Sequence, residues 1–146
     1  RCKDMGATAP LTIGIHCNHR WEGIAQVAPL CDVLSIHPYF RCGPNADEAS
    51  YAANLDMYVD FARQAGKPLL VTETCWGYQD DRERVETIRT TLKHLKQRNI
   101  GFLVYLLNHS LIADAHRNSF GPGRLNLSFI EADGSLRPGH EVFNEY

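Results

Sequence analysis

Four short apolar segments constrain the fold of this chain more than any other feature. They are LTIGIHC (11–17), DVLSIHPYF (32–40), PLLVTETCW (68–76) and GFLVYLLN (101–108). Each is rich in β-branched or aromatic residues and has the length of a β-strand. Three are nearly continuous hydrophobic runs, which is typical of strands buried on both faces of a parallel sheet. The segments therefore predict four parallel strands.

Helical patterns fill the intervals between these segments. Residues 45–66 carry apolar side chains at helical spacing, and Gly66 marks the end of this predicted helix. Residues 21–32 give a shorter and weaker helical pattern. Residues 80–101 give the clearest pattern, with Asp80 or Asp81 as the cap and an apolar stripe of Val85, Ile88, Leu92 and Leu95. The order β-α-β-α-β-α-β predicts an α/β fold with right-handed crossovers.

Length and composition fit one domain that spans residues 1–146. Of the 146 residues 44% are hydrophobic, which is enough for a single core. The net charge of −2 provides no electrostatic basis for binding nucleic acid or an anionic membrane. No apolar run approaches the roughly 20 residues of a membrane-spanning helix. We therefore expect neither nucleic acid nor a membrane as a partner.

The C-terminal residues depart from the alternating pattern. Residues 113–126 form a loop that contains Gly and Pro, and residues 127–138 predict a short strand or a turn at Asp133-Gly134. Residues 139–146 are compatible with a last helix.

The five cysteines predict free, buried thiols rather than a disulfide framework. Their number is odd, and no CxxC or zinc-ribbon spacing occurs among Cys2, Cys17, Cys31, Cys42 and Cys75. Three lie in or beside apolar runs, where a reduced cysteine behaves as a small hydrophobic residue.

Side chains able to do chemistry follow the predicted strands. His37 and Tyr39 end the second strand and Glu73 ends the third. The carboxyl ends of parallel strands share one edge of the sheet, where α/β proteins bind ligands. Alternation along a strand places His37 and Tyr39 on one face, from which they could hydrogen-bond Glu73 and set its orientation. Other candidates at this edge are Trp21, Trp76, Tyr105, Asn108 and His109.

At these residues the sequence resembles the retaining glycoside hydrolases of clan A, most closely the cellulase-like family 5. DVLSIHPYF, KPLLVTETCWG and GFLVYLLNHS look like the sixth, seventh and eighth strands of that barrel, and EADGSLRPGHEVFNEY is similar to its closing segment. The resemblance implies a (β/α) half-barrel, strands 5–8 of a TIM barrel. It also implies that Glu73 in TETCWG is the catalytic nucleophile, flanked by His37 and Tyr39.

The sequence departs from the family pattern in two places. The eighth strand lacks the tryptophan on which many members stack a sugar, and Tyr105 stands there instead. No Asn-Glu precedes residues 11–17, so the general acid/base of the family has no counterpart. We therefore expect the isolated chain to show little or no glycosidase activity.

A half-barrel would expose two unpaired strand edges and an apolar inner face. We expect a partner to cover them, either a second copy of this chain in a homodimer or a separate N-terminal half-barrel chain.

The resemblance implies a β-linked glycan as the substrate. Aromatic rings with polar neighbours suit the C–H faces and hydroxyls of pyranosides, so we expect Trp76, Trp21, Tyr105, Asn108 and His109 to bind sugar. The main hypothesis needs neither a cofactor nor a metal ion.

Two other functions compete with this hypothesis. His19, His37 and Asp114 could bind zinc in a metal-dependent hydrolase on the same barrel, although that assignment leaves Glu73 without a role. Alternatively, the chain is a non-catalytic carbohydrate-binding or inert half-barrel, because a fold does not by itself prove turnover.

Overall fold

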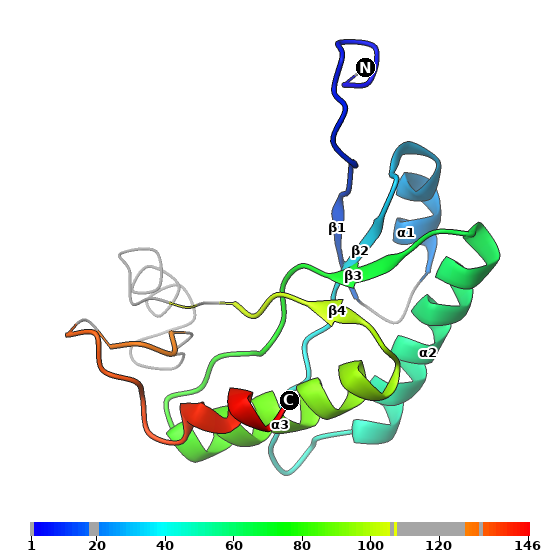
Figure 1. Ribbon diagram of the computed structural model, residues 1–146. Coiled ribbons are helices and arrows are strands. Elements are labelled where there is room, and N and C mark those ends of the chain that lie inside the picture. Colours follow the sequence, from blue (N-terminus) through cyan, green and yellow to red (C-terminus); the bar gives the residue numbers. More distant parts are fainter. Residues whose placement is uncertain (1, 18–20, 106, 108–127, 132) are drawn as a thin grey trace.

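Four parallel strands form the centre of the molecule. The computed structural model describes residues 2–17, 21–105, 107, 128–131 and 133–146. Strands β1 (Gly14–His16), β2 (Leu34–His37), β3 (Leu69–Val71) and β4 (Gly101–Phe102) lie in the order β1-β2-β3-β4, and all neighbours are parallel (Figure 1). All four predicted strands are present, and each is shorter than its apolar segment. The predicted α/β class is confirmed.

Three α-helices lie along one side of this sheet (Figure 1). They are α1 (Glu22–Val27), continued by the 3-10 turn η1 (Ala28–Leu30), α2 (Glu48–Ala65) and α3 (Asp81–Gln97). Asp80 caps α3 by accepting a hydrogen bond from the Arg82 amide at 2.7 Å. Gly66 ends α2 at a φ of 64°, a left-handed conformation that glycine adopts without the steric cost of a Cβ.

The main core lies between the sheet and these helices. Ile36 and Val71 of the strands pack with Leu55 and Tyr58 of α2 and with Leu95 of α3, and all five are fully buried. The helical pattern predicts that Ala52 and Ala53 face the core, but Ala52 is half-buried and Ala53 is exposed. Helix α2 instead turns its large side chains toward the sheet, because they bury more apolar area than alanine does.

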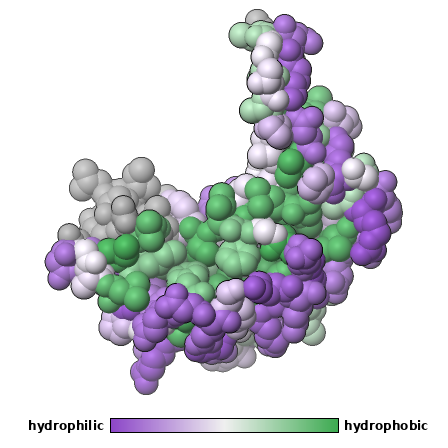
Figure 2. All heavy atoms as spheres, viewed as in Figure 1, coloured by the Kyte–Doolittle hydropathy of each residue, from purple (hydrophilic) through white to green (hydrophobic). Residues whose placement is uncertain are grey.

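The other face of the sheet has no described helix over it. Gly14, His16, Gly101 and Leu103 are exposed on this side, and β1 and β4 each pair with one described strand only. Figure 2 shows apolar residues gathered across the middle of the view, near β3 and β4, and hydrophilic residues over α2 and α3. The open face is more polar than we expected, because small and hydroxyl-bearing residues alternate with leucines along it.

The C-terminal segment returns to α3. A single antiparallel bridge joins Ile130 to Leu136 around the predicted turn at Asp133-Gly134, and the last residues form a 3-10 helix, η2 (His140–Glu145). Arg137 is buried and bonds Asp81 at the start of α3. The predicted loop 113–126 lies outside the described residues.

The five cysteines are free thiols, as predicted, but only two of them are buried. Cys31 and Cys75 are buried, Cys17 and Cys42 are half-buried, and Cys2 is exposed. No helix in the described ranges is long and apolar enough to cross a membrane.

Candidate active site

Glu73 lies just beyond the carboxyl end of β3, with its side chain one-third exposed. Regular strand alternation would place it beside Val71, on the side of the sheet that the helices cover. Strand β3 ends at Val71, however, and the chain bends at Glu73. The carboxylate therefore reaches the end of β2, where the Tyr39 hydroxyl donates a hydrogen bond to Oε1. His37 Nδ1 lies 3.8 Å from Oε2.

The two neighbours of Glu73 stay uncharged at neutral pH. Burial raises the pKa of the Tyr39 phenol, and the hydrogen bond to Glu73 raises it further, so Tyr39 remains a donor. Burial lowers the pKa of His37 below its usual 6.5, and the Glu73 charge only partly opposes this shift. His37 is therefore a neutral polar neighbour of Glu73 rather than a cation.

Polar side chains also lie beneath His37. Its Nε2 is 3.0 Å from the hydroxyl of Thr72, which in turn bonds the hydroxyl of Ser35. Gly14 of β1 makes room for the ring, since a Cβ at this position would lie 2.3 Å from His37 Nε2. The ring centroid of His16 lies 5.9 Å away.

Trp76 belongs to the same cluster. Its ring meets Tyr39 edge to face, with 5.3 Å between the centroids. The guanidinium carbon of Arg41 lies 3.9 Å from the centroid of the Trp76 ring, a cation–π contact. The structure thus brings together His37 and Tyr39 at the end of β2 with Glu73 and Trp76 beyond the end of β3.

The other expected sugar-binding residues are not all at this cluster. Trp21 is half exposed and stacks on Phe61 of α2 at 6.4 Å. Tyr105 follows β4, donates its backbone N–H to the Thr74 carbonyl at 3.1 Å and helps to raise the pKa of Tyr39. Asn108 and His109 lie outside the described residues.

Our sequence analysis missed Arg84, a fully buried arginine in α3. Its guanidinium donates to the backbone carbonyls of Cys75, Trp76 and Tyr105, the last at 3.1 Å. Burial lowers the pKa of Arg84 to about 10, so it is still charged at neutral pH. Arg84 therefore ties the loop that carries Glu73 and Trp76 to the loop that follows β4.

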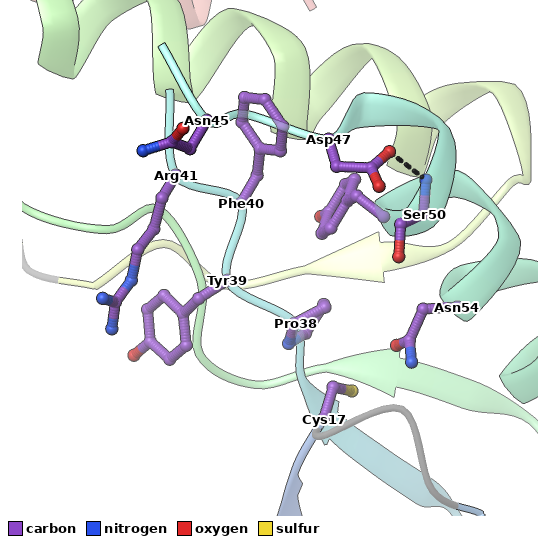
Figure 3. Close-up of a pocket in the computed structure, with 10 residues that line it drawn as sticks. Cys17, Pro38, Tyr39, Phe40, Arg41, Asn45, Asp47, Ser50 and Asn54 are labelled. Atoms are coloured by element: carbon purple, nitrogen blue, oxygen red, sulfur yellow. Dashed lines mark hydrogen bonds between the residues drawn. The ribbon is translucent and has the colours of Figure 1, made fainter. Parts of the chain in front are cut away.

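A cavity of about 240 Å³ with a mixed polar and apolar lining opens beside Tyr39. Figure 3 shows Tyr39 and Arg41 along one side of it, and Asp47, Ser50 and Asn54 from the start of α2 along the other. Its volume is below the roughly 300–1,000 Å³ of pockets that enclose drug-sized ligands. The cavity therefore suits a small group beside Tyr39, and Glu73 is not among the residues that line it.

The described residues contain no cluster of three or more His, Cys, Asp or Glu that could hold a metal ion. Of the three residues in the zinc hypothesis, only His37 lies among them. His19 and Asp114 lie outside the described residues.

Most of the chain is similar in structure to parts of larger glycosidases. A β-galacturonidase from Eisenbergiella tayi matches with a TM-score of 0.73 and 16% identity over 98% of this chain and 27% of that protein. A β-glucuronidase from Bifidobacterium dentium matches with a TM-score of 0.65 and 15% identity over 93% and 23%. The fold is a partial β/α barrel.

A third similar structure is an endo-β-1,4-glucanase from Xanthomonas axonopodis pv. citri. The TM-score is 0.51 with 11% identity, over 78% of this chain and 36% of the glucanase. The chain thus spans only about a quarter to a third of the length of these three enzymes. No protein-family model matches the sequence. No curated protein matches it either.

Proposed function

We propose that this chain carries the nucleophile side of a retaining glycosidase active site for a β-linked glycan. One observation carries the proposal: the Glu73 carboxylate lies at the carboxyl end of a barrel-type sheet, between the Tyr39 hydroxyl and the neutral His37 ring. Tyr39 occupies Oε1, so Oε2 is the oxygen available for attack. The similarity to three glycosidase structures supports the same class of reaction.

The proposed step is the one that retaining enzymes use. Oε2 of Glu73 attacks the anomeric carbon of the sugar, and the bond from that carbon to the leaving oxygen breaks with its electron pair. Water later hydrolyses the glycosyl ester. Tyr39 keeps the carboxylate oriented, and Trp76 offers an aromatic surface beside it.

The second carboxyl of such a site lies about 5–5.5 Å from the nucleophile and protonates the leaving oxygen. We propose that the other half of a completed barrel supplies it. Among the described strands β1 and β4 each pair on one side only, and this pairing and the open face of the sheet are consistent with a barrel completed by another half. That half is a second copy of this chain or an N-terminal half-barrel.

Covalent labelling tests the nucleophile alone. The reagents are 2-deoxy-2-fluoro-β-glycosides with a dinitrophenolate leaving group, which departs without an acid. A glucuronic acid reagent belongs in the set, because Arg41 places a cation beside Trp76 and two of the similar structures are uronidases. Intact-mass spectrometry should show one sugar adduct, and peptide mapping should place it on Glu73.

Two variants complete this test. Glu73→Gln should abolish labelling, whereas Glu141→Gln, on an exposed side chain of η2, should leave it unchanged. An adduct on another residue would overturn the assignment. So would the absence of any adduct from a folded chain mixed with a front-half barrel chain. Sugar binding without an adduct in that mixture would favour the non-catalytic carbohydrate-binding alternative.

Sedimentation at micromolar concentration tests the partner. Self-association is expected if a second copy completes the barrel, and a stoichiometric complex with a front-half chain is expected if it does not. A folded monomer that forms no complex with a front-half chain would contradict both forms of the partner proposal.

A further inference from the structure

Three side chains on the open face of the sheet form a hydrogen-bonded row whose last member, His37, faces Glu73. Ser35 and His37 come from β2, and Thr72 follows β3 directly. The Ser35 hydroxyl bonds the Thr72 hydroxyl, which lies 3.0 Å from His37 Nε2. The other ring nitrogen of His37 faces Oε2 of Glu73. The row thus leads from Ser35 within β2 to the side of His37 that faces the proposed nucleophile.

The number of protons gives this row a direction. Each hydroxyl has one proton to donate, and a neutral imidazole has one N–H. If Ser35 donates to Thr72 and Thr72 donates to Nε2, both hydroxyl protons have acceptors and the ring proton is on Nδ1. In the reverse direction, the Ser35 proton has no acceptor among the described residues. Ser35 is only 1% exposed, so that proton would be buried and unsatisfied, which is unfavourable.

The Glu73 end of the row favours the same direction. An N–H at Nδ1 points its positive end toward the Oε2 carboxylate oxygen across 3.8 Å. In the other tautomer a nitrogen lone pair would face the negative charge. The separation is too long for a hydrogen bond, so the interaction is the attraction between the N–H dipole and the carboxylate. Only a neutral imidazole has two tautomers, and burial keeps His37 neutral by lowering its pKa.

We propose that Ser35 and Thr72 are positioning residues that hold His37 in its Nδ1–H tautomer, with that proton directed at Glu73. The role of this proton in the attack on a sugar rests on the proposed function. The tautomer itself does not. The tight seat of the ring against Gly14 holds Nε2 beside the Thr72 hydroxyl. Strands β1, β2 and β3 therefore each contribute to one arrangement.

Nitrogen-15 NMR of the histidine rings tests the tautomer without any reaction. In the native chain His37 should give the chemical shifts of a protonated Nδ1 and an unprotonated Nε2. Thr72→Val keeps the shape and removes the hydroxyl, so the Nε2–H tautomer should become populated. Thr72→Ser should restore the native spectrum. Thr90→Val, which removes a mostly buried hydroxyl of α3, is the matched control and should change nothing at His37.

A double-mutant cycle separates the two ends of the row. In Glu73→Gln the hydroxyl row alone should keep the ring proton of His37 on Nδ1. Adding Thr72→Val should populate the tautomer with the proton on Nε2. A loss of the Nδ1–H tautomer in Glu73→Gln alone would overturn the proposal, because the carboxylate would then be the only determinant. A native His37 with its proton on Nε2 would overturn it directly.

Gly14→Ala perturbs the row while leaving every hydroxyl in place. The added Cβ would meet His37 Nε2 at 2.3 Å, so the ring must move away from Thr72. The loss of the Nδ1–H signal is expected again, and this variant decides the question if Thr72→Val does not fold.

Labelling of Glu73 measures the consequence for the nucleophile. Thr72→Val should slow the formation of the adduct about three- to tenfold, in line with the net worth of one hydrogen bond, and Thr72→Ser should restore the rate. An unchanged rate together with a changed tautomer would overturn the positioning role. If Glu73 of the native chain is never labelled while the NMR shifts behave as expected, the proposed function fails and the tautomer assignment holds.

Discussion

The Tyr39 hydroxyl and Oε1 of Glu73 form a hydrogen bond that joins the ends of two neighbouring strands. This bond uses Oε1, so under the proposed function Oε2 is the oxygen that faces a substrate. It also depends on the chain leaving strand geometry after Val71, since regular alternation would turn Glu73 toward the helices. The bend at Glu73 is therefore part of the site.

Tyr39→Phe should slow labelling of Glu73 by roughly ten- to a hundredfold, because a bond to a charged acceptor contributes about 1.5–3 kcal/mol. The raised pKa of Tyr39 means that the wild-type phenol donates throughout the neutral range. The measurement is the rate of adduct formation by mass spectrometry. Tyr78→Phe is the control, because the Tyr78 hydroxyl donates to the Cys42 carbonyl at 2.9 Å and should not affect the rate. Equal rates for both variants would contradict a role for the Tyr39 bond.

Arg84→Met should destabilise the fold by about 3 kcal/mol or more, because it leaves the carbonyls of Cys75, Trp76 and Tyr105 without their donor. Urea unfolding followed by circular dichroism measures this change. Arg82→Met, two residues away on a 93% exposed side chain, should change the free energy of unfolding by less than about 0.5 kcal/mol. Similar losses in both variants would show that Arg84 does not hold the two loops.

The sequence predicts the elements of this fold well because their signals are local. Apolar runs at strand length, the Asp80 cap and the Gly66 stop depend on neighbours within a few residues. The buried face of α2 was predicted in part: Leu55 and Ala62 are buried as expected, whereas tertiary packing places Tyr51 and Tyr58 in the core and leaves Ala53 exposed. The lengths of the strands were overestimated, because a strand continues only as far as neighbouring strands pair with it.

The site was predictable where strand ends converge and not where the chain turns. His37, Tyr39, Glu73 and Trp76 meet because parallel strands share one edge. Trp21 packs on Phe61 instead, a contact between helices that no local pattern contains. Arg84 did carry a signal, because it lies four residues before Ile88 on the apolar stripe of α3. We did not identify it, since a charged residue on such a stripe is usually interpreted as a boundary. The roles of Asn108 and His109 stay predictions.

Arg137→Met should destabilise the chain by roughly 2 kcal/mol, because Arg137 is buried and connects the C-terminal segment to the start of α3. Its guanidinium bonds Asp81 at 2.9 Å and Glu131 at 2.9 Å. A double-mutant cycle with Asp81→Asn, measured by urea unfolding, should give a coupling of about 1 kcal/mol. Additive effects would mean that the two side chains do not cooperate.

Stability should fall as the pH drops below about 6.5, and His140 should account for part of this loss. The ring is 1% exposed, and burial lowers its pKa below the usual 6.5, with Arg84 and Arg137 opposing a further positive charge. At pH values between the pKa of His140 in the folded chain and its pKa of about 6.5 in the unfolded chain, the unfolded chain binds more protons than the folded one. The loss of stability caused by His140 therefore grows as the pH falls through this range. His37 acts in the same direction, because burial also lowers its pKa. The contribution of both residues is fully present above about pH 6.5.

Urea unfolding at pH 7.5 and pH 5.5 measures this loss in the native chain, in His140→Gln and in the double variant that adds His37→Gln. The difference between the two pH values should shrink in the single variant and shrink again in the double variant. Asp56, whose pKa Arg98 holds below 3.8, contributes only at more acid pH and does not confuse the comparison. A native chain that is equally stable at both pH values would contradict the buried neutral state of these two rings.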